Sequence, residues 1–218
     1  YPFEVRGPRL NLRSMDGSRL SYCVLLGVTI FHAYNVAVAG LDPRHYFEDV
    51  VTECLGQRGL LAGNLGRERR KASDFGDAVY RIGEQCKLSP SIEDATVRTH
   101  AQEEGVDVIA HMYWGDSRPI HWVFVVQATC GKSDTWQRKL FESSEGMWKS
   151  ILGLRVHPKA VLAVPHHIQP EFLRYLAEKG SGDKLVLDRL RLCSMNGMDL
   201  EGASQVCERL VDIEVEFE

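Results

Sequence analysis

Apolar residues recur along the chain with two different periods, which separate the predicted helices from the predicted strands. In the segments 45–55 and 75–87 they fall three or four positions apart, as on one face of a helix. In the segments 106–113 and 121–128 they form short, nearly continuous runs, as in buried strands. The predicted elements, in chain order, are a hairpin within 1–13, helices at 22–36, 45–55 and 75–87, strands at 106–113 and 121–128, a helix at 135–152, a strand at 160–164, a helix at 170–179, a strand at 185–192 and a helix from 206.

Capping and turn residues mark the boundaries of these elements. Asp42, Asp74 and Asp134 each precede a predicted helix, where an aspartate side chain accepts hydrogen bonds from the free N–H groups of the first turn. The Gly- and Arg-rich segment 56–71 predicts a loop, and the segment 88–104 is polar and irregular. The order of the elements predicts an α/β fold with a mixed central β-sheet flanked by α-helices.

Length and composition limit the class of protein. The chain has 218 residues, 44% of them hydrophobic and 26% charged, which is typical of a globular protein with one large or two small domains. We expect residues 1–40, the hairpin and an apolar helix, to pack on a main domain at 41–218. No apolar run approaches the ~20 residues that a membrane helix needs, so no membrane association is expected. The six cysteines show no C-x-x-C spacing, and most lie in apolar runs, which predicts reduced thiols and a cytoplasmic location.

The charge distribution leaves two interpretations open. A net charge of −4 weakens any attraction of the whole surface for nucleic acid, but phosphate binding depends on local clusters of basic residues. One such cluster consists of Arg67, Arg69, Arg70 and Lys71. It is either a solvated loop or a contact site for phosphate groups.

Two polar residues stand out in the apolar segments of the predicted sheet. Asp107 lies at the start of one predicted strand, where it could also serve as a turn cap. Gln127 follows the most apolar run of the chain, and a buried amide without partners costs about 1–3 kcal/mol. It therefore either satisfies a backbone neighbour or faces a polar site. A hairpin would place Asp107 and Gln127 side by side.

This pair of residues suggests phosphodiester chemistry. The Asp107 carboxylate, the Gln127 amide oxygen and the Ala128 carbonyl are hard oxygen ligands of the kind that Mg²⁺ or Mn²⁺ prefers. A bound metal polarises a phosphoryl oxygen and lowers the pKa of an attacking water. A lysine would orient that water and offset developing negative charge, and Lys132 and Lys139 are both candidates.

The same residues carry a resemblance to a known family. Gly-Val-Asp-Val-Ile at 105–109, followed by Val-Val-Gln-Ala-Thr at 125–129, resembles the restriction-endonuclease-like (PD-(D/E)XK) superfamily. The similarity is closest to its Mrr-like branch, whose sites pair G-[IV]-D with Q-x-K. Tyr-Phe-Glu at 46–48 is similar to the "FE" helix of that branch. The run 127–131, with Trp136 and Lys139 after it, resembles a variant seen in bacterial anti-phage defence proteins.

The resemblance covers residues 40–165 and implies a restriction-endonuclease-like core at about 44–165. It implies a Mg²⁺-dependent (or Mn²⁺-dependent) DNA endonuclease, the effector of a prokaryotic anti-phage system, acting with other subunits or domains of a defence complex. Asp107 would be the central metal ligand, and Gln127 with Ala128 would complete the shell. Glu48 would support the site from its helix, with Glu53 as the alternative. The expected DNA contacts are Arg67, Arg69, Arg70 and Lys132.

One position departs from the pattern of the branch. Thr129 stands where Q-x-K has its lysine. In the superfamily the lysine can lie on the following helix, which favours Lys139 over Lys132. The alternative is a catalytically inactive nuclease-fold module that binds DNA or a partner protein, and RNA is a third possible substrate.

Overall fold

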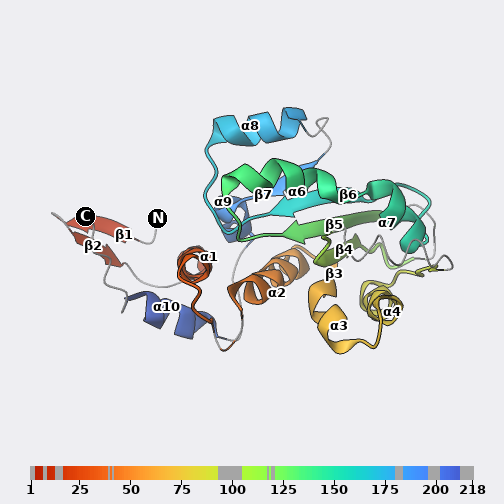
Figure 1. The fold of residues 1–218 in the computed structure, drawn as a ribbon, viewed down its shortest axis with the longest axis horizontal. Coiled ribbons are helices and arrows are strands. Elements are labelled where there is room, and N and C mark those ends of the chain that lie inside the picture. The colour runs from red at the N-terminus through yellow and green to blue at the C-terminus, as the bar shows by residue number, and fades with distance from the viewer. Residues whose placement is uncertain are drawn as a thin grey trace.

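A five-stranded mixed sheet forms the centre of the protein (Figure 1). The computed structural model describes residues 3–6, 9–12, 17–38, 40, 42–92, 105–116, 118, 121–179, 184–195 and 202–211. The strands follow one another in the sheet in chain order: β3 (Leu61–Asn64), β4 (Val108–Met112), β5 (Trp122–Ala128), β6 (Lys159–Ala163) and β7 (Leu185–Leu187). The pairs β3–β4 and β4–β5 are antiparallel, whereas β5–β6 and β6–β7 are parallel. A separate hairpin joins β1 (Phe3–Arg6) to β2 (Arg9–Leu12).

Helices cover both faces of this sheet. On one face α2 (Pro43–Gln57) contacts β3, β4 and β5, and α1 (Gly17–Ala33) packs against α2, α9 (Arg189–Cys193) and α10 (Ala203–Val211). Phe47 and Val50 of α2 share a buried cluster with Val108, Val126 and Val161 of the sheet. The α/β prediction with a mixed sheet between helices is therefore confirmed.

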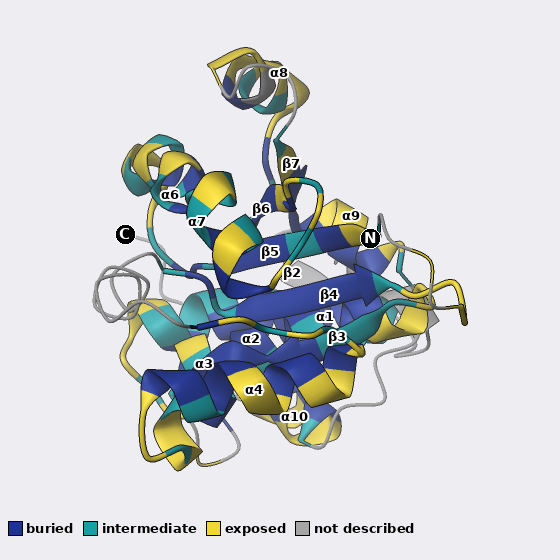
Figure 2. Cartoon of the chain, turned by 90° about the vertical axis from the view of Figure 1, so that its right-hand side faces the viewer, coloured by how far each residue is buried: buried dark blue, intermediate teal, exposed yellow. Residues whose placement is uncertain are grey.

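The other face is covered in two parts. Val123, Val125 and Ile109 pack with α4 (Phe75–Cys86) and α7 (Glu145–Ile151), and Leu162 and Val186 pack with α6 (Trp136–Glu142) and α8 (Pro170–Lys179). The two faces alternate residue by residue along β4, which is buried over nearly all of its length (Figure 2). Strand β4, which is buried over nearly all of its length, therefore begins directly after Asp107.

Several predicted boundaries were wrong. The expected loop at 56–71 contains β3 and the short helix α3 (Leu65–Lys71), which starts where the Asn64 side chain accepts from the Arg67 N–H. The expected helix at 135–152 is a 3₁₀ turn (Ser133–Thr135) followed by α6 and α7, and Asp134 does not cap it. The expected strand at 185–192 ends at Leu187, because Asp188 caps α9.

Other predictions agree with the structure. The Asp42 and Asp74 side chains accept hydrogen bonds in the first turns of α2 and α4. All six cysteines are buried free thiols. Among the described residues, no helix combines the length and the apolar character needed to cross a membrane. The turn of the first hairpin, most of the segment 88–104 and the acidic end of the chain lie outside the described residues.

Candidate functional site

Asp107 and Gln127 lie opposite each other where β4 begins and β5 ends. The register pairs Val108 with Val126, and the Asp107 N–H donates to the Val126 carbonyl at 2.9 Å. The Asp107 carboxylate accepts the N–H of Ala128 through Oδ2 at 2.8 Å. The side chain is thus fixed against the end of β5, as the hairpin prediction required.

Gly105 lets these two segments approach. Its φ of +56° is in the left-handed region, and a Cβ placed there would overlap the Gln127 side-chain amide. A side chain at position 105 would therefore be unfavourable for two steric reasons. One is the left-handed backbone conformation, and the other is the close packing of Gln127.

Gln127 is buried, and its amide has a defined orientation. Nε2 donates to Glu142 Oε2 at 2.9 Å, while Oε1 has no hydrogen-bond partner among the described residues. Since an ionised carboxylate only accepts hydrogen bonds, Glu142 requires the NH₂ group on its own side and leaves the amide oxygen facing away from it. Gln127 therefore satisfies another side chain rather than the backbone neighbour considered in the sequence.

Glu142 also belongs to this group of residues, although the sequence pattern did not indicate it. Its Oε1 also pairs with Arg138, and its Oε2 lies 3.9 Å from Lys139 Nζ. In the sequence these pairs have the (i, i+3) and (i, i+4) spacing of an exposed helix face, so Glu142 resembles an ordinary surface residue. The contact with Gln127 depends on how α6 packs on the sheet, and no local sequence pattern signals it.

Glu48 reaches the same region from α2. It is only 7% exposed, and its Oε2 lies 3.0 Å from Arg70 Nη1. Burial raises the pKa of Glu48, and the charge and hydrogen bond of Arg70 oppose that rise. Glu53, five residues further along the helix, points about 140° away from Glu48 and accepts a hydrogen bond from Gln57.

Gly66 at the start of α3 leaves the space that the Glu48 carboxylate occupies. A Cβ at Gly66 would overlap that carboxylate. The Gly66 N–H also donates to the Asp107 carbonyl at 3.0 Å. The start of α3 therefore links the backbone of Asp107 to the side chain of Glu48.

Several of these groups act on the Asp107 carboxylate, and their balance raises the pKa of Asp107 to about 7. Burial is the largest cause of the rise, and the charge of Glu48 adds to it. The Ala128 N–H and the charges of Arg69 and Lys139 lower it in part. The residue as a whole keeps some exposed surface, but its carboxylate is crowded by protein atoms.

The structure distinguishes the two candidate lysines. The charge of Lys139 acts on Asp107, and its side chain is 26% exposed. Lys132 is exposed in the loop after β5, where it lines a hollow of about 540 Å³ together with Trp136 and Phe172. Thr129, at the position of the missing lysine, is buried, and its hydroxyl accepts the Gly131 N–H at 3.1 Å.

His166 and His167 line the same hollow. His166 Nε2 lies 3.1 Å from the Cys130 carbonyl oxygen, within hydrogen-bond distance. His167 Nδ1 lies 3.8 Å from Asp188 Oδ2 and has no hydrogen-bond partner among the described residues. The two rings therefore face different protein groups.

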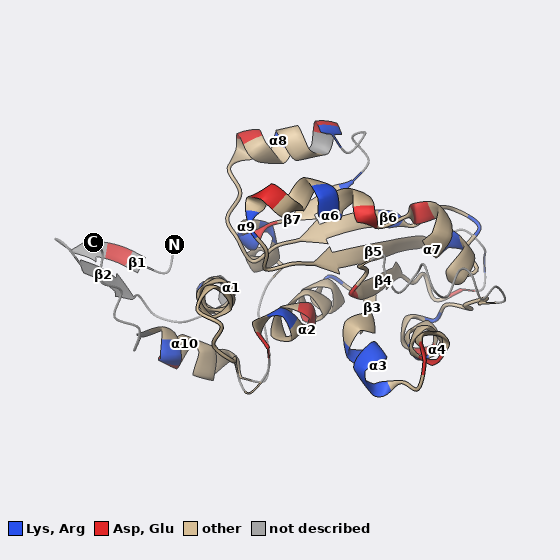
Figure 3. Cartoon of the chain, viewed as in Figure 1, with Lys and Arg blue, Asp and Glu red and all other residues tan. Residues whose placement is uncertain are grey.

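The basic cluster lies on α3 (Figure 3), and two of its arginines pair with acidic residues. Arg67 pairs with Asp49 at 3.3 Å, and Arg70 pairs with Glu48. Arg69 stacks its guanidinium 5.1 Å from the centre of the Phe75 ring, and burial lowers its pKa. The segment expected to be a loop is therefore in part a helix whose Arg70 contacts Glu48, and the DNA contacts of these arginines stay a prediction.

The side chains around Asp107 offer oxygen donors, the type of donor that a hard divalent cation prefers. The charge of Glu48 raises the pKa of Asp107, and Gln127 Oε1 is a buried acceptor without a partner among the described residues. Among the described residues no three His, Cys, Asp or Glu side chains gather as a metal site. Two carboxylates, an amide oxygen and waters form the type of set that Mg²⁺ accepts, whereas structural zinc sites need more protein ligands.

Comparisons with known proteins add little. No family model matches the chain, and no curated protein matches it. Among solved structures, protein VC1899 from Vibrio cholerae aligns over 95% of this chain with 9% identity and a TM-score of 0.24. This chain spans 58% of that protein's length, and a TM-score this low does not establish a shared fold.

The close approach at Gly105 predicts a stability effect with a matched control in the chain. Gly105→Ala should destabilise the fold by about 2–4 kcal/mol, because the left-handed backbone alone costs about 1–2 kcal/mol and the new methyl group also displaces Gln127. Gly115 has a φ of +77° with open space around it, so Gly115→Ala should show the backbone cost alone. Urea unfolding measures both, and equal losses would contradict the packing role of Gly105.

The raised pKa of Asp107 predicts a pH-dependent stability. The folded chain binds this proton with a pKa of about 7, against an ordinary value of 3.8. The resulting stabilisation is fully present below pH 3.8 and is lost as the pH rises through 7. The free energy of unfolding of Asp107→Asn, relative to that of the wild type, should therefore rise by up to about 4 kcal/mol from pH 4 to pH 8.

Urea unfolding across this pH range, with EDTA present, measures that difference. A constant offset between the two proteins would contradict the raised pKa. In a Glu48→Gln background the gain should be smaller, because the Glu48 charge no longer raises the pKa of Asp107.

Proposed function

We propose that this chain is a metal-dependent endonuclease that hydrolyses DNA phosphodiester bonds on a restriction-endonuclease-like core. The observation that carries the proposal is the electrostatic coupling of Asp107 to both Glu48 and Lys139. Glu48 and Lys139, from two separate helices, both act on Asp107. Gln127 lies opposite Asp107 in the sheet, and its side-chain oxygen has no hydrogen-bond partner among the described residues. Such coupled, perturbed groups are typical of functional sites.

Each residue has a role in this proposal. Asp107 and Glu48 would hold the cation, and Gln127 would direct its amide oxygen toward it because Glu142 fixes the opposite side of the amide. When bound, the ion would polarise the phosphoryl oxygen and supply a more acidic water. The Lys139 ammonium would offset negative charge that develops on the phosphate.

Lys139 takes the place of the lysine missing at position 129. Its contact with Glu142 Oε2 at 3.9 Å ties it to the carboxylate that also orients Gln127. One residue of α6 therefore positions two proposed catalytic groups. In this arrangement Lys139 supplies the positive charge of the site, and Thr129 takes part in the turn after β5 instead.

A second candidate function is a nuclease-fold module without catalysis, which binds DNA or a partner protein. The observation that favours it is the ion pair between Arg70 and Glu48, which occupies the carboxylate that a cation would need. In a nuclease, metal binding would have to release Arg70, which could then contact a phosphate group. The anti-phage setting, and partners within a defence complex, rest on the resemblance of the motifs.

DNA cleavage with Mg²⁺ or Mn²⁺ tests the proposal. Plasmid and linear DNA should be cut by the wild type, and Asp107→Ala and Lys139→Ala should each lower the rate by at least about 100-fold, as loss of a transition-state contact does. Lys132→Ala is the matched control, with an expected change of only a few-fold. The urea midpoints of all variants must be compared, so that unfolding is not read as lost catalysis.

The outcomes separate the candidates. Equal cleavage by the wild type and Asp107→Ala would refute the assignment of the site. DNA binding without cleavage by any of the proteins, with either metal, would favour the non-catalytic module. A parallel RNA substrate of the same sequence decides which sugar the site accepts.

A further inference from the structure

The hollow that Lys132, Trp136 and Phe172 line lies at the carboxyl ends of two parallel strands. Its residues come from the connection between β5 and α6, from the connection between β6 and α8, and from the first turns of the two helices. Strands β5 and β6 are direct neighbours in the sheet. In α/β sheets, ligands commonly bind in the crevice outside the carboxyl ends of the strands. The hollow therefore has the position of a ligand site.

The hollow is adjacent to the candidate nuclease site. Trp136 and Lys139 are three residues apart on α6, so their side chains are neighbours on the helix surface. On the opposite wall, His166 Nε2 lies 3.1 Å from the carbonyl oxygen of Cys130. Cys130 comes two residues after the end of β5, where the Asp107 carboxylate is bound. A DNA strand with a phosphodiester at Asp107 would therefore have the hollow within reach of a neighbouring nucleotide.

The walls of the hollow combine aromatic rings with polar groups. The centre of the Trp136 ring lies 5.4 Å from that of His166 and 6.1 Å from that of Phe172. The lining also carries a hydroxyl, an imidazole and an amide group, on Ser133, His167 and Gln169. A nucleobase has an apolar face and a hydrogen-bonding edge, and unstacked bases are recognised by aromatic stacking together with hydrogen bonds. The lining therefore matches the chemistry of a base.

Size and charge agree with this occupant. The volume of about 540 Å³ is within the roughly 300–1,000 Å³ of typical small-molecule sites. Phe172 is only partly buried, Lys132 is exposed, and none of the described lining residues is acidic. A single ammonium attracts a phosphate group without selecting a base, because phosphate contacts position a strand and base contacts specify it. The aromatic wall would therefore supply the dependence on the base.

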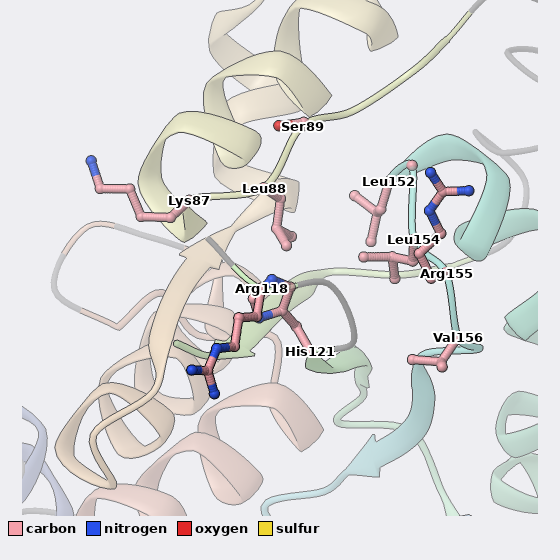
Figure 4. Close-up of a pocket in the computed structure, with 10 residues that line it drawn as sticks. Lys87, Leu88, Ser89, Arg118, His121, Leu152, Leu154, Arg155 and Val156 are labelled. Atoms are coloured by element: carbon pink, nitrogen blue, oxygen red, sulfur yellow. The ribbon is translucent and has the colours of Figure 1, made fainter. Parts of the chain in front are cut away.

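The pocket at the other end of β4 and β5 is a weaker candidate for a nucleotide. It has a volume of about 220 Å³. Figure 4 shows Lys87 and Arg118 on one side of it and Arg155 on the other. These three charged groups diverge, so no two of them face one phosphate group.

We propose that the hollow binds one unstacked base of a DNA strand whose neighbouring phosphodiester lies at Asp107, an inference that rests on the proposed function of that site. The preferred substrate is then single-stranded DNA, or a duplex with an unpaired nucleotide beside the bond that is cut. In a fully paired duplex the base would first have to leave its stack, which costs free energy.

Fluorescence anisotropy of labelled oligonucleotides tests this inference on the full chain, with EDTA present so that no cleavage takes place. Single-stranded oligothymidylate should bind at least about fivefold more tightly than an abasic strand of the same length, because both carry the same phosphates but only the first carries bases to stack. This comparison uses the wild type alone, so it does not depend on the folding of a variant.

A pair of variants locates the effect in the hollow. Phe172→Ala should weaken binding of oligothymidylate by at least about fivefold and leave binding of the same strand paired with oligoadenylate unchanged. Phe141→Ala is the matched control, since Phe141 is an exposed aromatic residue of the neighbouring helix α6 that does not line the hollow. It should leave both affinities unchanged, and the urea midpoints of the two variants show that both are folded.

The outcomes are separate from those of the cleavage assay. Base-dependent binding that Phe172→Ala alone weakens would support the hollow even in a chain that cuts no DNA. The inference is overturned if oligothymidylate does not bind at submillimolar concentration, if the abasic strand binds equally well, or if the Phe172→Ala and Phe141→Ala variants behave alike. Cleavage of DNA together with any of these results would refute the hollow and leave the nuclease proposal standing.

Discussion

Burial of the Asp107 carboxylate between two strands and a second acid is the constraint on which the candidate site depends. Three hydrogen bonds hold Asp107. Its N–H donates to the Val126 carbonyl, its carbonyl accepts from the Gly66 N–H, and its carboxylate accepts from the Ala128 N–H. These bonds come from β5 and α3, so the carboxylate cannot move away from Glu48 without disrupting the sheet. The cost of holding it there appears in its pKa of about 7. Such strain is typical of a site built for a ligand rather than for stability alone.

The neighbouring elements are arranged to tolerate this constraint. Gly105 and Gly66 remove the side chains that would collide with Gln127 and Glu48. Arg69 and Lys139 both place positive charge near Asp107. Arg69 lies on α3, before Asp107 in the sequence, and Lys139 lies on α6, after it. The site is therefore balanced by groups whose positions depend on tertiary packing, and a change in either helix would alter the pKa of one carboxylate.

Sequence patterns predicted the parts of this structure that local physics determines. The caps at Asp42 and Asp74 and the pairing of Asp107 with Gln127 follow from short-range rules. Strand β3 could not be predicted in this way, because the residues Leu-Ala-Gly-Asn form a strand only by pairing with β4. Glu142 and the arginines of α3 were missed or misplaced for the same reason, since their partners are distant or their local pairs look like surface pairs.

The net charge of the chain does not describe the charge at either end of the sheet, because acidic and basic residues are distributed unevenly between the two ends. At the end of the sheet with Asp107, acids are matched by cations, as in the pairs of Glu48 with Arg70 and of Glu142 with Arg138. At the opposite end, Lys87 and Arg155 border a pocket in which none of the described lining residues is acidic. A total of −4 averages over both. An anionic ligand responds to the local field within about one Debye length, roughly 8–10 Å, so each end must be judged by its own groups.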